Sequence, residues 1–206
     1  MYLVFDTETT GLPRSWRAPA SDIHNWPRVV QVAWEAFDER DQMMDSVSFI
    51  IRPDGFTIPA DAERVHGIST SYAQNHGVAI AQALEGFLKT AENTQVLVGH
   101  NISFDLNVIG AELHRMGQGG ALQPKTHLCT MRNSTAFCGI PGQYGYKWPT
   151  LTELHAKLFG EEARETHDAA ADTATCSKCF FELKRRGIVK FARSAPAAKA
   201  EPLLRA

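Results

Sequence analysis

The stretch VFDTETTGLP, residues 4–13, places two acidic residues at the end of an apolar segment. Residues 2–6 are apolar up to Asp6, a pattern that favours a strand buried on both faces. Side chains two positions apart on a strand point to the same face, so Asp6 and Glu8 are expected to project together. The alternative is a strand that simply runs out into solvent. Gly11-Leu12-Pro13 ends the strand in either case.

The length and composition of the chain predict one globular domain. It has 206 residues, of which 44% are apolar and 21% charged, and this is ample for a sizeable core. We expect residues 1–192 to form the domain and residues 193–206 to be a disordered C-terminal tail.

Charge and cysteine content limit the class of protein. No apolar run approaches the roughly 20 residues of a membrane span, and the first residues lack the basic segment of a secretory signal. Four cysteines are too few for a disulfide scaffold, so we expect reduced thiols, a cytoplasmic location and no membrane partner. The net charge of −2 gives no overall basic field, so a nucleic-acid partner would be held locally, by a basic rim or by bound metal.

Periodicity divides the rest of the domain into strands and helices. Val29–Phe37 and Val47–Ile51 have the pattern of two further strands joined by a turn, which favours an antiparallel three-stranded start. Val96–Val98 is a short buried strand. The order of elements predicts an α/β domain with a mixed sheet, three antiparallel strands followed by parallel strands, flanked by helices. Four helices are expected: at about residues 78–88, in the segment that follows residue 101 and has Leu106, Ile109, Leu113 and Met116 as its apolar stripe, and at about residues 150–158 and 166–186.

Two more acids fall at the borders of predicted apolar faces. Asp105 lies in the first turn of a helix, four residues before Ile109 on its apolar stripe. Helix starts favour carboxylates, which is a sufficient reason for any single acid there. Asp172 precedes Cys176 by four residues, so it lies on or beside the buried face of the last helix. An unpaired carboxylate in that position costs several kcal/mol, so it needs a metal ion or a buried Arg or Lys partner.

One or two divalent cations would satisfy all four acids together. Carboxylate oxygens suit Mg²⁺ or Mn²⁺, whereas zinc prefers histidine or cysteine. His167 precedes Asp172 by five residues, and Thr166 or Asp168 can cap the helix that follows it. An imidazole at that position could act as a general base near neutral pH, or it could be an ordinary surface histidine.

These residues resemble, in order, the motifs of the DEDD exonuclease superfamily, in the branch with a histidine in its third motif. FDTETTGL at residues 5–12 is similar to the first motif, VGHNISFDLNVI at 98–109 to the second, and HDAAAD at 167–172 to the third. VHGIS at 65–69 resembles a further signature of the family. The similarity covers about residues 1–185. Each motif alone is weakly specific, but all of them in order are strongly specific.

The resemblance implies a ribonuclease-H-like fold and removal of single nucleotides from 3′ ends in the 3′ to 5′ direction. By similarity, four acids bind two Mg²⁺ ions, for which Mn²⁺ can substitute, and His167 removes the proton of the attacking water. Single-stranded DNA or a frayed 3′ end is the expected substrate, and RNA or short oligoribonucleotides are the alternative. The four acids are Asp6, Glu8, Asp105 and Asp172.

Four further residues are candidates for substrate contact. Thr9 could reach the terminal 3′ hydroxyl, and His66 could hydrogen-bond the terminal nucleotide or its phosphate, as the family signature suggests. Leu12 could wedge between the last two bases, or it could belong to the core. Phe104 could line the substrate channel, with core packing as the alternative.

Other features set the chain apart from the short proofreading subunits of bacterial replicative polymerases. The proline-bracketed loop at residues 13–27 is longer. Arg14, Trp16, Arg17 and Trp26 could give it a cationic, aromatic lip, or it could be an ordinary solvated loop. KWPTLTELHAKLFG at residues 147–160 also departs from those subunits. No glutamine-plus-aromatic peptide of the sliding-clamp type is present, so we do not expect association with a polymerase.

Two motifs favour structural roles. Cys176 and Cys179 share a helix face without a second pair at zinc-finger spacing, so we expect core thiols rather than a zinc site. Lys184-Arg185-Arg186 ends the last helix, where cations suit the helix dipole. Two functional alternatives also remain: a non-catalytic binding module on the same fold, and a two-metal endonuclease.

Overall fold

A five-stranded sheet in the order β3-β2-β1-β4-β5 is the centre of the computed structural model, which describes residues 1–161 and 167–190. β1 pairs antiparallel with β2 on one side and parallel with β4 on the other. β2 pairs antiparallel with β3, and β4 pairs parallel with β5. This arrangement confirms the predicted α/β class and mixed sheet. The strands are β1 (Tyr2–Thr9), β2 (Val29–Phe37), β3 (Met43–Ile50), β4 (Val96–Gly99) and β5 (Thr126–Cys129).

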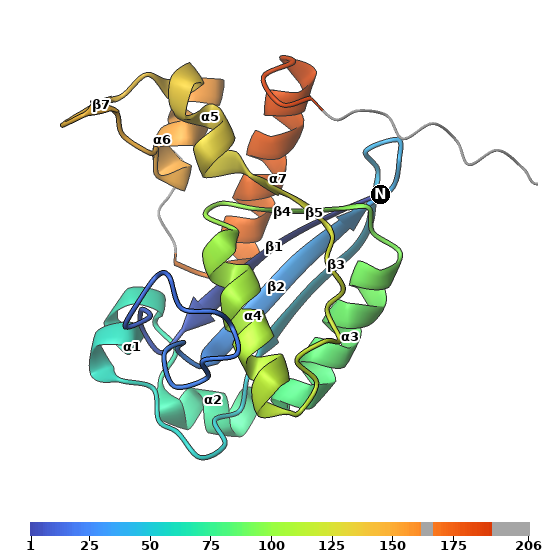
Figure 1. The fold of residues 1–206 in the computed structure, drawn as a ribbon, viewed down its shortest axis with the longest axis vertical. Coiled ribbons are helices and arrows are strands. Elements are labelled where there is room, and N and C mark those ends of the chain that lie inside the picture. The colour runs from blue at the N-terminus through green and yellow to red at the C-terminus, as the bar shows by residue number, and fades with distance from the viewer. Residues whose placement is uncertain (162–166, 191–206) are drawn as a thin grey trace, which may run out of the picture.

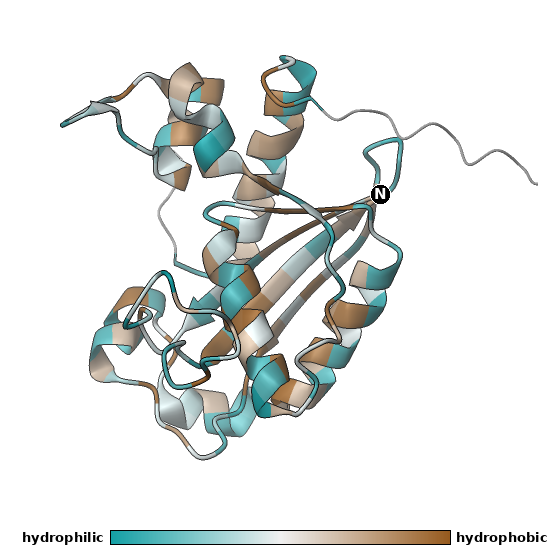
Figure 2. Cartoon of the chain, viewed as in Figure 1, coloured by the Kyte–Doolittle hydropathy of each residue, from teal (hydrophilic) through white to brown (hydrophobic). Residues whose placement is uncertain are grey.

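Helices cover both faces of the sheet (Figure 1). One face packs against α3 (Ile80–Glu92) and α4 (Ser103–Arg115), and the other against α6 (Leu151–Phe159) and α7 (Ala169–Arg185). Figure 2 shows the strands as largely hydrophobic, as expected for a sheet buried between two layers. Successive residues of β1 alternate between the two layers.

The alternation in β1 separates two hydrophobic clusters. Leu3 and Phe5 pack with Leu84 and Phe87 of α3, whereas Val4 packs with Phe180 of α7. Continuing the alternation sends Asp6 and Glu8 toward the α7 side and Thr7 toward the α4 side. A register irregularity between Glu8 and Thr9 ends the regular pairing of β1 with β2.

The structure contains several short elements that the periodicity did not reveal. Residues expected to be loop include the start of α1 (Ala60–His66), and α2 (Thr70–His76) follows it. α5 (Thr130–Cys138) and a small hairpin of β6 (Pro141–Gly142) and β7 (Gly145–Tyr146) were also not predicted. Helices of seven to nine residues carry only one or two turns of apolar pattern, too little to distinguish them from loop.

The long predicted helices exist with shifted ends. The expected helix at 78–88 is α3 at Ile80–Glu92, and the expected helix at 166–186 is α7 at Ala169–Arg185. Of the two residues expected to cap the last helix, Asp168 does so, and Thr166 lies outside the described residues. The predicted tail at 193–206 lies outside them too. Within the described ranges, no helix is long and apolar enough to cross a membrane.

Candidate functional site

Three carboxylates from two distant segments meet where β1 ends and α7 begins. Asp6 and Glu8 project from β1, and Asp172 comes from the first turn of α7. One oxygen of each residue lies within 4.8 Å of the chosen oxygen of the other two. The predicted same-face arrangement of Asp6 and Glu8, and their approach to Asp172, are therefore present in the structure.

Gln31 fixes the start of α7 against the sheet. It lies opposite Glu8 in the β1–β2 register. Its Nε2 donates to Oδ2 of Asp168 at 3.0 Å, and its Oε1 accepts from the backbone N–H of Ala169 at 3.1 Å. Sequence reasoning missed this residue, although a polar side chain within the apolar run VVQVAWEAF was a visible signal. The contacts link the strand beside Glu8 to the helix that carries Asp172.

Asp105 reaches the same region from α4, on the other side of β1. The backbone N–H and the hydroxyl of Thr7 both donate to its Oδ1, at 3.1 and 2.7 Å. Asp105 is almost fully buried and lies outside the three-residue cluster. Thr7 is the residue between Asp6 and Glu8, so a single D-T-E segment supplies two acids and orients a third. Its role was not visible in the sequence because its partner is 98 positions away.

Burial and mutual repulsion make these acids hard to ionise. Burial, followed by the charges of Asp105 and Glu8, raises the pKa of Asp6 well above its usual range. Burial raises the pKa of Glu8 to about 8, with Asp172 adding to the effect. Burial also raises the pKa of Asp105 to about 7, against the opposing hydrogen bonds from Thr7. Perturbed carboxylates gathered in this way are typical of functional sites.

The donor set fits a hard divalent cation. Among the described residues, no Lys or Arg forms an ion pair with Asp6, Glu8 or Asp105. Clustered carboxylate oxygens suit Mg²⁺ or Mn²⁺, and a bound cation would offset the repulsion between these acids without their taking up protons. The residues on α7 and β1 could hold such an ion directly.

His167 lies two residues before α7, the helix that carries Asp172, and it has an unusual backbone. Its φ of 44° falls in the left-handed region, which few residues other than glycine adopt. The side chain of His167 is exposed, and its proximity adds to the effect of burial in lowering the pKa of His66. Strained backbone of this kind is found disproportionately at functional sites. The assignment of His167 as a general base stays a prediction.

His66 presents an unused donor. It ends α1 and is buried, and its Nδ1 accepts from the backbone N–H of Ile68 at 3.1 Å. Burial lowers the pKa of His66. The neutral ring then carries its proton on Nε2, which has no hydrogen-bond partner among the described residues. The carbonyl of Thr9 is close enough to raise the pKa but is outside hydrogen-bonding geometry.

The turn after β1 exposes one apolar side chain. The Thr9 hydroxyl donates to the carbonyl of Gly11 at 2.6 Å and shapes this turn. Leu12, at its tip, is 74% exposed, so the alternative that it belongs to the core is wrong. An exposed leucine at this point is available for contact with a ligand.

The loop at residues 13–27 is fixed to α4 rather than loosely solvated. Arg115 donates to the carbonyls of Ile23 and Trp26, at 2.5 and 2.6 Å. Trp26 is buried in the core, so its predicted place in an exposed aromatic lip is wrong. Trp16 is exposed and its ring lies 5.7 Å from that of Phe104, which itself packs on the core. Phe104 therefore packs on the core, as one alternative expected, and also contacts the exposed ring of Trp16.

The cysteine pair and the basic cluster of the last helix have the structural positions expected for them. Cys176 and Cys179 are buried free thiols, and burial raises the pKa of Cys179 to about 12. At the end of α7, Lys184 pairs with Asp41, while Arg185 and Arg186 pair with a neighbouring glutamate.

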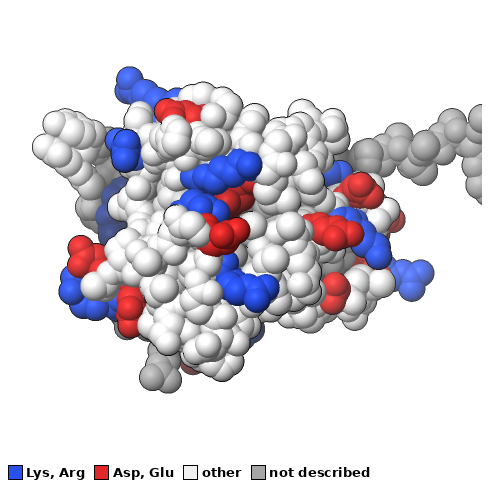
Figure 3. All heavy atoms as spheres, turned by 90° about the horizontal axis from the view of Figure 1, so that it is seen from below, with Lys and Arg blue, Asp and Glu red and all other residues white. Residues whose placement is uncertain are grey.

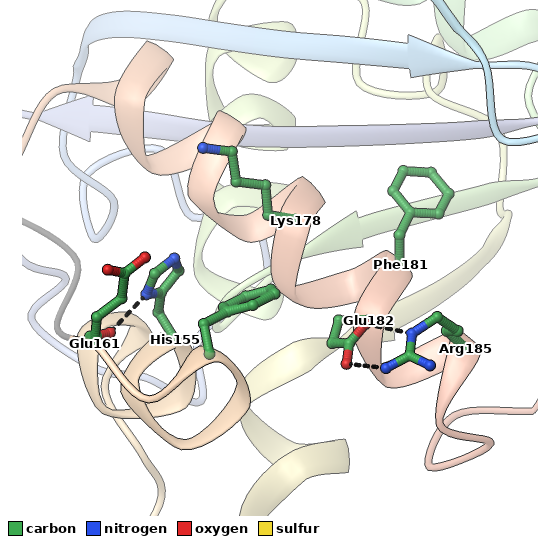
Figure 4. A pocket seen from close by; sticks show the side chains of 7 residues that line it. His155, Glu161, Lys178, Phe181, Glu182 and Arg185 are labelled. Carbon is green, nitrogen blue, oxygen red and sulfur yellow. Dashed lines mark hydrogen bonds and ion pairs between the residues drawn. The ribbon is translucent and has the colours of Figure 1, made fainter.

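A surface hollow of about 380 Å³ lies away from these acids, against α6 and α7 (Figure 4). It includes none of the acidic cluster, and its charged groups are partly paired with one another. On the face seen in Figure 3, basic and acidic side chains are interspersed, in keeping with the net charge of −2. The residues lining the hollow are His155, Phe159, Glu161, Lys178, Phe181, Glu182 and Arg185.

Comparison with known proteins agrees with this geometry. A family model described as "Exonuclease" matches residues 3–180. A DNA polymerase III subunit epsilon-like protein of Rhodobacter capsulatus is 32% identical over 92% of this chain and 25% of its own length. The 3′-5′ exonuclease DinG of Bacillus subtilis is 30% identical over 88% of this chain and 17% of its own length. This chain therefore spans a quarter or less of these two relatives.

Solved structures share the fold. Escherichia coli Exonuclease I in complex with a dA16 oligonucleotide superposes with a TM-score of 0.68 at 20% identity. The match covers 89% of this chain and 40% of that one. It confirms the predicted ribonuclease-H-like mixed sheet with flanking helices.

Proposed function

Because this chain belongs to the exonuclease family, we propose that it removes nucleotides from single-stranded or frayed 3′ ends of DNA, in the 3′ to 5′ direction, by metal-dependent hydrolysis. The observation that carries the proposal is the approach of Asp6, Glu8 and Asp172 to within 4.8 Å without a basic partner for the two acids of β1 among the described residues. A binding module on the same fold would have no use for such a costly cluster.

The acids hold the cofactor in this proposal. Two Mg²⁺ or Mn²⁺ ions bound by Asp6, Glu8, Asp105 and Asp172 would polarise the scissile phosphodiester and offset the negative charge that develops on it. Thr7 keeps the Asp105 carboxylate oriented through two hydrogen bonds. Orientation of this kind reduces the reorganisation needed when the reaction occurs.

The histidines act on the proton and the phosphate. His167 takes the proton of the attacking water on a ring nitrogen, and its exposed side chain can pass that proton to solvent. The Nε2–H of His66 donates to an oxygen of the terminal nucleotide, which satisfies a buried donor that has no hydrogen-bond partner within residues 1–161 and 167–190.

The turn and loop after β1 hold the terminal bases. Leu12 inserts between the last two bases from its exposed position, and the neighbouring Thr9 segment faces the terminal 3′ hydroxyl. The exposed ring of Trp16, tilted against that of Phe104, offers a surface for a further base. Single-stranded DNA is favoured over RNA because one relative is named after a DNA polymerase subunit and one structural neighbour is in complex with a DNA oligonucleotide.

The test uses 5′-labelled DNA and RNA of one sequence, single-stranded and duplex, incubated with Mg²⁺, Mn²⁺ or EDTA. We expect a ladder that shortens from the 3′ end of single-stranded DNA, lost in EDTA, and no cutting of closed circular DNA. Asp6→Asn and Asp172→Asn should abolish the ladder. Asp45→Asn, which changes an exposed acid on β3, is the matched control and should cut normally. An active Asp6→Asn protein would refute the site.

A further inference from the structure

Three aromatic side chains are exposed close together on the β6–β7 hairpin and the segment after it. Tyr144, Tyr146 and Trp148 are 94%, 61% and 58% exposed. The hairpin projects from the α5–α6 side of the molecule (Figure 1). Exposed aromatic residues concentrated in five positions indicate a surface that contacts a ligand or partner.

The segment that carries these aromatic residues is basic, although the whole chain carries a net charge of −2. The guanidinium of Arg132 lies 5.4 Å from the centre of the Trp148 ring, on its face. Between residues 130 and 160 the basic residues are Arg132, Lys147 and Lys157, against one acid, Glu153. A ring paired with a cation suits a base stacked beside its phosphate.

Hydrogen bonds connect this surface to the elements that carry the acidic site. The carbonyl of Pro149, next to Trp148, accepts from Nε2 of His100 at 3.0 Å. His100 lies at the end of β4 and opens the segment that leads to Asp105. Its Nδ1 is 3.0 Å from the hydroxyl of Thr130, the first residue of α5.

The second connection runs to α7. The Thr130 hydroxyl is 3.7 Å from Sγ of Cys176, which lies one turn beyond Asp172. Thr130 is also two residues before Arg132. The Arg132–Trp148 pair is therefore held beside the segments that position Asp105 and Asp172.

The backbone around Trp148 is also fixed. Lys147 forms an ion pair with Glu153 at 2.6 Å, and Thr150 and Glu153 make a reciprocal capping box at the start of α6. A rigid platform binds a flexible chain with a smaller loss of conformational entropy than a mobile one.

We infer that this aromatic–basic surface, made by Arg132, Tyr144, Tyr146 and Trp148, binds the single-stranded nucleotides upstream of the terminal one. The inference rests on the proposed exonuclease function, and it extends the substrate contact beyond the acidic site. Bases stack on the exposed rings without sequence preference, and Arg132 pairs with the backbone phosphate.

Binding is measured separately from cleavage, by fluorescence anisotropy of 5′-fluorescein dT20 and dT4 in EDTA. Stacking on one ring is worth roughly 1–3 kcal/mol, so Trp148→Ala should weaken dT20 binding about tenfold. The same change should weaken dT4 binding much less. Trp148→Phe, which keeps a ring, should retain most of the affinity. Tyr72→Ala, which removes an exposed aromatic ring from α2, is the matched control and should bind as the wild type does.

The outcomes separate the two proposals. If the wild type binds dT20 but never shortens it with Mg²⁺ or Mn²⁺, the proposed function fails while a tenfold loss in Trp148→Ala still supports the surface. If the wild type degrades DNA and Trp148→Ala and Arg132→Gln bind dT20 with wild-type affinity, the surface proposal is overturned. An equal loss for dT4 and dT20 would also overturn it, because the contact would then lie at the terminal nucleotide. Thermal unfolding of each variant shows whether it is folded.

Discussion

Without its cation, the protein should become less stable as the pH rises, and Glu8 should account for a large part of the effect. The pKa of Glu8 is about 8 in the folded protein, chiefly through burial and then through the charge of Asp172, against 4.5 for a free glutamate. Between these values the folded state binds more protons than the unfolded state. Stability therefore falls with rising pH across this window.

The size of the effect follows from the two pKa values. At 1.36 kcal/mol for each pKa unit, the difference sets an upper limit of about 5 kcal/mol at pH 8. Glu8 is only half-buried, and water screens part of the repulsion, so we take about half of this, roughly 2 kcal/mol. For a domain of this size that free energy corresponds to a change in Tm of roughly 4–8 °C.

The assay is thermal unfolding followed by circular dichroism in EDTA between pH 5 and pH 9. We expect the Tm of the wild type to fall across this range. Glu8→Gln should have a flatter profile and a higher Tm at pH 8, because the neutral amide removes the repulsion. Glu85→Gln, an exposed glutamate on α3, should follow the wild type. Mn²⁺ or Mg²⁺ should raise the Tm of the wild type more at pH 8 than at pH 5. At pH 8 the same ions should raise the Tm of Glu8→Gln less than that of the wild type.

A Glu8→Gln protein that is less stable than the wild type at pH 8 in EDTA would refute this reasoning. It would mean that Glu8 is ionised and favourably paired in the metal-free protein. A wild-type Tm equally raised by Mg²⁺ at pH 5 and pH 8 would point the same way.

Three further predictions concern residues that orient the site. Gln31→Leu leaves two groups at the start of α7 unpaired, so we expect a loss of about 1–3 kcal/mol in urea unfolding and a drop in kcat; unchanged activity would contradict its positioning role. Thr7→Val removes the 2.7 Å hydrogen bond to Asp105, and should lower kcat roughly tenfold with little change in KM for single-stranded DNA, whereas Thr7→Ser should retain most of the activity. Arg115→Met removes the donor to the carbonyls of the loop and leaves Glu112 with Arg28 as its remaining basic partner, so the free energy of unfolding in urea should fall by about 2 kcal/mol. Limited proteolysis of this variant should cut first within residues 13–27. Resistance equal to that of the wild type would count against the anchoring of the loop by Arg115.

Much of the fold could be predicted from the sequence because its longest elements have clear patterns. The apolar run at the start of β1, the strand patterns that follow it and the period of the last helix together predicted a mixed sheet covered by helices. The short helices α1, α2 and α5 were missed since their stability comes from packing, not from their own seven to nine residues.

For the site, too, local sequence pattern could predict some residues but not those whose contacts are distant in sequence. The acids could be predicted because each lies at an end or border of an apolar element, where a charge is conspicuous. The partners of Thr7 and Gln31 could not be predicted, because they lie 98 and 137 positions away; the polar Gln31 within an apolar run marks the residue but not what it binds. Both alternatives for Trp26, an aromatic lip or a solvated loop, left it exposed, because a polar loop gives no sign of which of its aromatic rings will be buried.

The alternation of β1 explains how so short a segment organises the whole site. Asp6 and Glu8 face α7 and meet Asp172, while Thr7, between them, faces the opposite layer and holds Asp105 of α4. A shift of the strand by one residue would exchange these faces and bury both acids in the α4 layer. The register is fixed by Leu3, Val4 and Phe5, which alternate between the two hydrophobic clusters. The apolar residues of β1 therefore do more than stabilise the sheet: by fixing which face each acid occupies, they determine whether the carboxylates can meet at all.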